Sequence, residues 1–249
     1  MEKPALTICR DADQLAETAV DFITRQASAA IAQRGRFSIA LTGGSTPGET
    51  YRRWAHRHDP RGTDWTKTYF FFGDERWVRH DDERSNYKLA QETLLAPAAI
   101  APDHVFAMPT DLPTPREAAE HYAATLQNFF AGDDPLPVID LVLLGLGEDG
   151  HVASLFPGAA SLAVDDSPVT WSPPGTLPPS VDRVTLTYPA INAARQVLFL
   201  VSGGRKARPF ADVWLGRAAR DVRPAVGVRP TSGGLAWLVD AAAASEIAR

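Results

Sequence analysis

The chain has 249 residues, 22% charged side chains and a formal net charge of −5 with histidine neutral. This acidic balance argues against a broad nucleic-acid surface, which needs a basic face, but it is compatible with a small cationic pocket. The single cysteine excludes an intrachain disulfide and a Cys-rich metal cluster, and it fits a reducing compartment. Because we find neither a signal peptide nor a run of about 18 apolar residues, we expect a cytoplasmic protein that does not span a membrane.

Apolar periodicity and turn residues predict helices that alternate with strands. The first element is a helix over residues 11–34, capped by Asp11 or Asp13 and ended by Gly35. The later elements, in chain order, are strand 36–41, helix 47–56, strand 67–72, helices 85–95 and 114–131, strand 138–145, an irregular stretch 157–182, strand 183–187, a short helix or turn 188–194, strand 196–202, a helix to about Gly216, strand 235–239 and helix 240–248.

This alternation predicts one α/β domain over residues 1–249, with a mostly parallel central sheet flanked by helices in a Rossmann-like three-layer sandwich. Three of the apolar strands end in a glycine-bearing loop that opens a helix. The loops contain Gly43-Gly44, Gly145–Gly150 and Gly203-Gly204. Ligands of such sheets bind beyond the carboxyl ends of the strands, so we expect the three loops to converge on one site.

The first loop, TGGSTPG, has the composition of an anion site. Gly43 and Gly44 allow backbone amides to approach an anion, the following helix adds partial positive charge, and Ser45 and Thr46 add hydroxyl donors. We therefore predict sugar-phosphate binding here, with a plain turn that needs glycine as the alternative. Ser45 is not expected to be a nucleophile, because Pro47 stands where the G-x-S-x-G elbow requires glycine.

The second loop, GLGEDGH, matches the dinucleotide pattern G-x-G-x-x-G, which is a weak signal by itself. Pro157 interrupts the helix that a dinucleotide unit requires, so we reject nucleotide binding. His151 follows Asp149 and Gly150 at the end of a buried strand, and imidazole can take and return a proton near neutral pH. We predict that His151 is the reactive group; a structural histidine at a helix start is the alternative.

Charged residues follow two further strands. Arg76 can bind a phosphate through its guanidinium fork, and Asp74 or Glu75 can orient His151 or a substrate hydroxyl. A surface ion-pair cluster is the alternative for this group. Lys206, next to Arg205 at a loop-to-helix junction, is a candidate phosphate ligand because a cation there is unfavourable unless an anion is near.

No metal site is predicted. His56 and His58 lack a third ligand and fit a solvated helix end, and His80 fits an exposed polar loop. We expect no cofactor, a small-molecule substrate as the partner, no nucleic acid, and a monomer or weak homo-oligomer.

Four blocks together resemble the 6-phosphogluconolactonase family: LTGGSTPGETY, FFGDERWV, DLVLLGLGEDGHVASLFPG and RVTLTYPAINAARQVLFLVSGGRKA. The family shares its fold with glucosamine-6-phosphate deaminases and isomerases, in which the DGH segment runs toward Asn-Glu-Pro; here SLFPG (residues 154–158) follows, as in the lactonases. The resemblance implies hydrolysis of 6-phospho-D-glucono-1,5-lactone to 6-phosphogluconate, in the oxidative pentose phosphate pathway, without a metal. The alternatives are a deaminase or isomerase on the same fold and a non-catalytic sugar-phosphate sensor.

The resemblance also assigns residues to roles. His151 matches the catalytic histidine, and we count Asp74 and Asp149 as catalytic candidates beside it. Asp74 and Arg76 match the DER motif of the family, in which the arginine faces the substrate phosphate. The phosphate-side positions are matched by Gly44, Ser45 and Lys206, and Arg183 matches an arginine before the TLT strand of the family. A lysine that many members carry before Arg183 is absent from this chain, and Arg205 or Arg183 is a candidate to replace it. In a hydrolysis at this site, amides of Gly147–Gly150 are expected to face the oxyanion.

Overall fold

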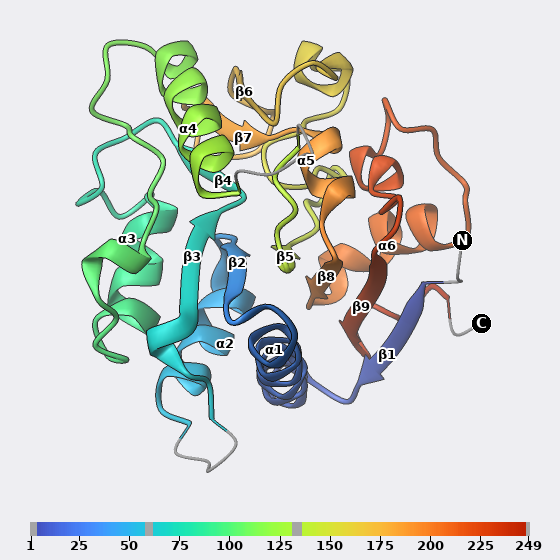
Figure 1. Cartoon of the computed structure of the whole chain (residues 1–249). Helices are drawn as coiled ribbons and strands as arrows, with labels where there is room; N and C mark the ends of the chain where they lie inside the picture. The colour runs from blue at the N-terminus through green and yellow to red at the C-terminus, as the bar shows by residue number, and fades with distance from the viewer. Residues whose placement is uncertain (1–3, 58–61, 131–135, 248–249) are drawn as a thin grey trace.

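Six parallel strands form the central sheet of this computed structural model, which describes residues 4–57, 62–130 and 136–247. Their order is β1-β9-β8-β5-β2-β3, and every neighbouring pair is parallel (Figure 1). The strands are Ala5–Cys9 (β1), Phe37–Leu41 (β2), Thr68–Phe72 (β3), Leu141–Leu144 (β5), Gln196–Val201 (β8) and Gly234–Asp240 (β9). The prediction of a mostly parallel central sheet is confirmed, and β1 is an edge strand that the sequence pattern did not predict.

A second, antiparallel sheet of three strands has the order β4-β7-β6 and packs under α4 (Figure 1). Its strands are Asp74–Arg76 (β4), Val169–Ser172 (β6) and Arg183–Leu186 (β7). The predicted strand 183–187 therefore forms, but outside the central sheet. The expectation that residues 157–182 are irregular is wrong for β6, which pairs along the whole length of β7. The register sets Arg76 opposite Arg183, so this sheet brings two cationic residues together.

The helices have bounds Ala12–Arg34 (α1), Ser45–Ala55 (α2), Asn86–Ala90 (α3), Pro115–Phe129 (α4), Tyr188–Ala193 (α5) and Ala207–Trp214 (α6). Asp11, one of the two predicted caps, accepts the Gln14 amide at 2.8 Å, and Gly35 ends α1 in the left-handed conformation. Helix α2 begins two residues before its predicted start, and α3 continues into a π-helical turn over Gln91–Leu95. Residue 131, the predicted end of α4, lies outside the described residues.

The predicted helix 240–248 is wrong over the residues that the structure describes. Residues 241–247 form successive turns, and strand β9 extends to Asp240. The Asp240 carboxylate accepts hydrogen bonds from the Ala243 amide, from the Ser202 hydroxyl and from the Gly203 amide. These bonds tie the end of β9 to the loop after β8. The predicted helix followed alanine propensity, which is a weak guide for so short a segment.

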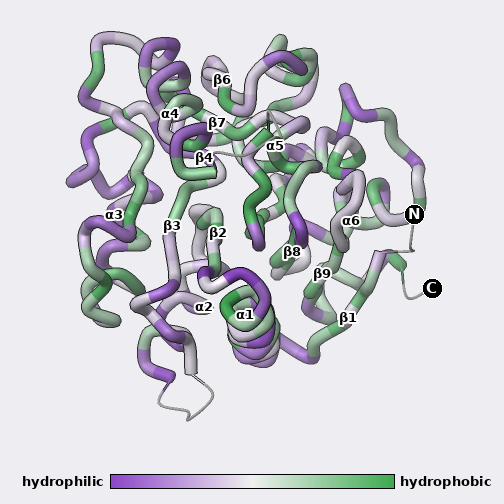
Figure 2. The backbone as a smooth tube through the Cα atoms, viewed as in Figure 1, coloured by the Kyte–Doolittle hydropathy of each residue, from purple (hydrophilic) through white to green (hydrophobic). Residues whose placement is uncertain are grey.

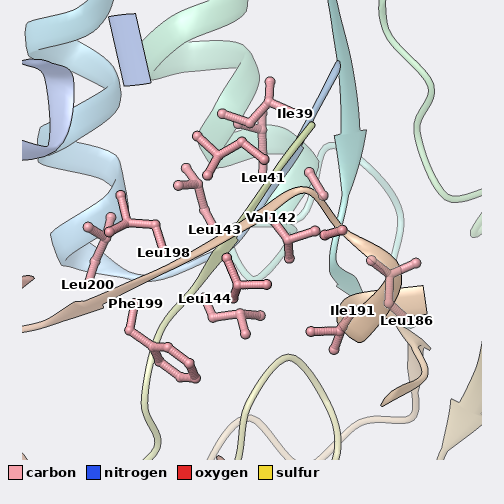
Figure 3. Close-up of a cluster of buried hydrophobic side chains, with 14 of the residues drawn as sticks. Ile39, Leu41, Val142, Leu143, Leu144, Leu186, Ile191, Leu198, Phe199 and Leu200 are labelled. Carbon is pink, nitrogen blue, oxygen red and sulfur yellow. The ribbon is translucent and has the colours of Figure 1, made fainter. Parts of the chain in front are cut away.

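Aliphatic side chains from β2, β5 and β8 interlock at the centre of the molecule (Figure 3). The strands themselves consist mainly of hydrophobic residues, whereas α1 mixes hydrophobic and hydrophilic residues along its length (Figure 2). The same cluster includes Leu186 of the second sheet, which is labelled in Figure 3 together with residues of the central strands. The expectation of one domain over residues 1–249 stays a prediction, which this shared core supports. Within the described residues, no helix combines the length and the apolar character needed to cross a membrane.

A buried carboxylate ties the start of β2 to the start of β5. Asp140 accepts hydrogen bonds from the Ser38 amide and hydroxyl, each at 2.8 Å, and forms an ion pair with Arg34 at 2.9 Å. Since its side chain is 8% exposed, water replaces few of these interactions if the carboxylate is removed. Asp140 thus fixes the relative position of two strands whose carboxyl ends carry the first two glycine loops.

Replacing Asp140 with alanine is expected to lower the free energy of unfolding by about 2–3 kcal/mol, because a buried amide and a cation lose their partner. Urea unfolding measures this loss. Asp166→Ala, at an exposed position, is the matched control and is expected to change stability by less than about 0.5 kcal/mol. Equal stabilities of the two variants would contradict the role given to Asp140.

Candidate functional site

The three glycine loops line one cavity of about 600 Å³ at the carboxyl ends of the parallel strands. They contribute Thr42–Pro47 after β2, Gly145–Glu148 after β5, and Ser202–Lys206 after β8. The prediction that they converge is confirmed. Of the residues predicted for the site, the following line this cavity: Gly43, Gly44, Ser45, Thr46, Asp74, Arg76, His151, Arg183 and Lys206.

Asp149 is the predicted site residue that does not line the cavity, and it lies directly behind His151. Its Oδ1 is 2.6 Å from Nδ1 of His151 and also accepts the His151 amide at 3.1 Å. Burial opposes the charge on Asp149, but the hydrogen bond and the attraction from His151 outweigh it and lower the pKa of that carboxyl. An ionised Asp149 accepts a hydrogen bond from Nδ1–H, and this tautomer leaves Nε2 as the basic nitrogen of the imidazole.

The pair requires glycine at position 147. A Cβ there would lie 2.1 Å from His151 Nδ1 and 2.5 Å from Asp149 Oδ1, closer than atoms approach without a bond. The amides of Gly147 and Gly150 are both used inside the turn, donating to the carbonyls of His151 and Gly147. The expectation that these two amides face an oxyanion is therefore wrong, because they close the loop that holds the pair.

The start of α2 presents free amides to the cavity. Its N-cap is Gly44, which has no side chain to accept hydrogen bonds from the first turn, unlike Asp11 at the start of α1. The helix dipole adds partial positive charge at the same point. Ser45 and Thr46, which open α2, line the cavity as well. This arrangement suits an anionic group.

Arg183 is an unusually buried cation in the cavity wall. It is 4% exposed, and its Nη2 donates to the Pro179 carbonyl at 2.8 Å. Its Nε and Nη1 are buried without a hydrogen-bond partner. Burial lowers the pKa of the guanidinium, although the neighbouring Asp74 opposes this effect. Two buried donors without acceptors are costly, and an anionic ligand in the cavity would satisfy them.

The remaining cations lie around the cavity with different partners. Arg76 donates to the Arg84 carbonyl at 2.6 Å. Arg205 is largely exposed and forms an ion pair with Glu148 at 3.1 Å. Burial lowers the pKa of Lys206, with the nearby Glu148 opposing the effect. The ammonium group of Lys206 forms no hydrogen bond or ion pair with the part of the chain that the structure describes, so it is available to a ligand.

The two carboxylates of the DER segment have different roles in the structure. Asp74 faces the cavity and accepts hydrogen bonds from Ser154 at 2.6 Å and Asn86 at 3.1 Å. Glu75 points away: it accepts the amides of Asn86 and Tyr87 and the Ser85 hydroxyl at the start of α3. Glu75 is therefore not available to orient His151, and neither carboxylate is hydrogen-bonded to His151 among the described residues. The surface ion-pair alternative is also wrong, because both carboxylates are buried.

Part of the cavity wall was not predicted. Phe156 lies beside His151, with ring centroids 5.0 Å apart, and the guanidinium of Arg183 lies 5.9 Å from the same ring. Leu177 and Pro178 line the cavity from the segment before β7. The sequence of this segment is that of an ordinary proline-rich loop. The position of the segment over the site is evident only from the structure, in which Gly175 packs against Phe156.

The other histidines within the described residues do not line the cavity. His56 caps the exposed end of α2, as predicted, and His58 lies outside the described residues. His80 is half-buried, not exposed as predicted, since it bonds to the Met108 carbonyl and stacks on Tyr87. Among residues 4–57, 62–130 and 136–247, no three His, Cys, Asp or Glu side chains are grouped to hold a metal ion.

Comparison with known proteins places this geometry in a family. Residues 10–237 match the family described as glucosamine-6-phosphate isomerases/6-phosphogluconolactonase. The chain belongs to this family. A 6-phosphogluconolactonase of Nostoc sp. is 38% identical over 246 residues, which cover 98% of this chain and 99% of the relative. The family and the enzyme class inferred from the sequence are thus confirmed.

Solved structures of family members have the same fold. The 6-phosphogluconolactonase from Trypanosoma cruzi superimposes with a TM-score of 0.87 at 28% identity, covering 99% of this chain and 98% of that one. A monomeric glucosamine-6-phosphate deaminase reaches a TM-score of 0.82 at 19% identity over 97% of this chain and 99% of its own, a likeness of fold alone. Both activities occur on this fold, so the distinction depends on the site.

Replacing Gly147 with alanine is expected to break the Asp149–His151 hydrogen bond, because the added methyl group occupies its space. The Nδ1–H resonance of His151 in proton–nitrogen NMR spectra reports this bond directly. Gly145→Ala is the matched control, since a Cβ at position 145 meets nothing within 4 Å. Retention of the wild-type resonance in Gly147→Ala would contradict the geometry described for the pair.

Proposed function

We propose that this protein hydrolyses 6-phospho-D-glucono-1,5-lactone to 6-phospho-D-gluconate, with His151 as general base and then general acid. The observation that carries the proposal is the Asp149–His151 pair in the wall of a cavity that also holds unpaired cationic groups. The names of the family members similar to this chain support the choice of substrate. An imidazole base next to an anion-binding site can act at the carbonyl of a lactone whose phosphate is bound at that site.

His151 activates water in the proposed reaction. Its Nε2 takes a proton from water as the oxygen attacks the lactone carbonyl, and the carbonyl oxygen becomes an oxyanion. When the ring C–O bond breaks, the protonated imidazole returns that proton to the departing ring oxygen. Asp149 holds the imidazole in one orientation and stabilises its charged form throughout. The reaction consumes one water molecule and leaves a carboxylic acid that ionises.

The phosphate provides the positioning in this proposal. The phosphate oxygens accept hydrogen bonds from three sources. These are the Nε and Nη1 nitrogens of Arg183, the ammonium group of Lys206, and the amides at the start of α2. Arg76, opposite Arg183 in the register of the second sheet, adds a further charge. Binding of the phosphate fixes the lactone carbonyl relative to His151. The binding energy is thus used to orient the reacting groups.

The SLFPG segment favours the lactonase over the deaminase. Ser154 donates to Asp74, and Phe156 forms the wall beside the imidazole of His151. This segment therefore builds one side of the proposed reaction centre. In the deaminases the corresponding stretch runs toward Asn-Glu-Pro, which would supply a carboxylate where Phe156 supplies an apolar surface.

We propose further that the reaction belongs to the oxidative pentose phosphate pathway in the cytoplasm, which the presence of only one cysteine fits. The protein acts as a monomer or weak homo-oligomer without a cofactor, and nucleic acid is not a ligand. The pathway follows from the proposed substrate, and the exclusion of nucleic acid follows from the acidic net charge.

A coupled assay tests the proposed activity. Glucose-6-phosphate dehydrogenase generates the lactone, and proton release is followed with and without the protein. Faster release than the spontaneous hydrolysis is expected, in proportion to protein concentration. Release at the spontaneous rate would overturn the proposal, and ammonia production from glucosamine 6-phosphate in a parallel sample would replace it with the deaminase.

Replacing His151 with alanine is expected to lower kcat for the lactone by at least about tenfold, because general acid–base help contributes about 10²–10⁴-fold. Binding of 6-phosphogluconate, measured by calorimetry, is expected to change little. His121→Ala is the control, since this histidine is exposed on α4. Near-normal turnover by the His151 variant would remove the role given to this residue.

Replacing Arg183 with methionine is expected to weaken 6-phosphogluconate binding by about tenfold or more, because charge-assisted hydrogen bonds to the phosphate are lost. Calorimetric titration of inorganic phosphate and of 6-phosphogluconate provides the measurement. Arg195→Met, which removes an exposed arginine that pairs with Asp140, controls for general loss of charge. An unchanged dissociation constant in Arg183→Met would exclude Arg183 from the anion site.

A further inference from the structure

The loop that carries His151 is held at both ends by one distant segment of the chain. The Ala225 amide donates to the Gly150 carbonyl at 3.0 Å, and the Gly158 amide donates to the Asp221 carbonyl at 3.0 Å. Residues 221–225 thus hold both ends of the segment 150–158, which contains His151 and the wall residue Phe156. Tyr188 fixes residues 221–225 in turn, because its hydroxyl donates to the Pro224 carbonyl at 2.7 Å.

Arg223 contacts this loop directly at the residue before His151. Gly150 has a φ of +85°, and a Cβ at this position would lie 2.4 Å from Arg223 Cδ and 3.1 Å from Arg223 Cα. The stem of Arg223 therefore fills the space beside Gly150 where another residue would have its side chain. Any shift of Arg223 moves the surface against which this backbone turn rests.

The guanidinium of Arg223 is fixed by Asp212 on α6. Its Nη2 lies 3.0 Å and its Nε 3.3 Å from Asp212 Oδ2, and both side chains are largely buried. Burial opposes the charge on Asp212, but hydrogen bonds from Arg223 and Arg208 outweigh it and lower the pKa of this carboxyl. Arg208 pairs with the other oxygen of Asp212 from an exposed position one helical turn away.

This ion pair links two sides of the cavity. Helix α6 begins at Ala207, directly after Lys206, whereas Arg223 rests on the loop of His151. The distance between the reactive histidine and the candidate phosphate ligand therefore depends on the Asp212–Arg223 pair. A change of about 1 Å in such a distance can cost about 10²-fold in rate.

We propose that Arg223, held by Asp212, is a positioning residue that sets His151 relative to Lys206. Arg223 does not line the cavity, so it acts through the backbone at Gly150. The inference rests on the proposed lactonase activity for its kinetic consequence, but its structural consequence can be measured without that activity.

The test compares Arg223→Met with Arg208→Met, since each removes one partner of Asp212 and only Arg223 contacts the loop. Arg223→Met is expected to lower kcat about tenfold, with a smaller change in KM, and to shift the Nδ1–H resonance of His151. Arg208→Met is expected to keep kcat within about twofold and the resonance unchanged. Arg223→Lys, which retains a cation for Asp212, is expected to recover part of the lost turnover.

Thermal unfolding of each variant separates positioning from stability. A kcat of Arg223→Met equal to that of Arg208→Met, with the His151 resonance unmoved, would overturn the inference. Equal losses of kcat in both variants would also overturn it, because they would follow from the charge of Asp212 and not from the contact with Gly150. If the wild-type protein does not accelerate lactone hydrolysis, the proposed function fails, and the resonance alone decides whether Arg223 positions His151.

Discussion

The hydrogen bond between Asp149 Oδ1 and His151 Nδ1 constrains the backbone on both sides of it. Only Gly150 separates the partners, so the chain must turn sharply between them, and Gly147 leaves the space that their side chains occupy. The turn uses the amides of Gly147 and Gly150, which removes these two amides from catalysis. Stabilisation of an oxyanion is left to other donors around the cavity, such as the amides of the first turn of α2, which has no side-chain cap among the described residues.

The charges around this pair explain how an acidic protein can bind an anion. Arg183, Arg76 and Lys206 gather at one cavity, while other arginines such as Arg53 and Arg84 pair with carboxylates on the surface. Burial of Arg183 without acceptors for two of its donors costs stability, a pattern typical of functional sites. The second sheet makes this arrangement possible, because its register sets Arg76 and Arg183 side by side at the edge of the cavity.

Much of this arrangement could be predicted because it follows from local sequence. Apolar strands that end in glycine loops predicted the parallel sheet and the meeting of the loops, and Asp149 lies two residues from its partner. The strands β4 and β6 could not be predicted, since they are short and depend on pairing with β7. Glu75 was a false candidate because its partners lie 10 to 12 residues away at the start of α3. The alanine-rich stretch after Asp240 favours a helix by propensity, but propensity is a weak guide for so short a segment, and residues 241–247 form turns.

The central claim is that the Asp149–His151 pair performs the chemistry, and turnover by Asp149→Asn tests it most directly. An asparagine keeps the shape of the side chain but removes the charge that fixes the imidazole tautomer and stabilises its protonated form. The account predicts that kcat for 6-phosphogluconolactone falls by at least about tenfold while the dissociation constant of 6-phosphogluconate stays within about twofold. A kcat equal to that of the wild-type protein would contradict it.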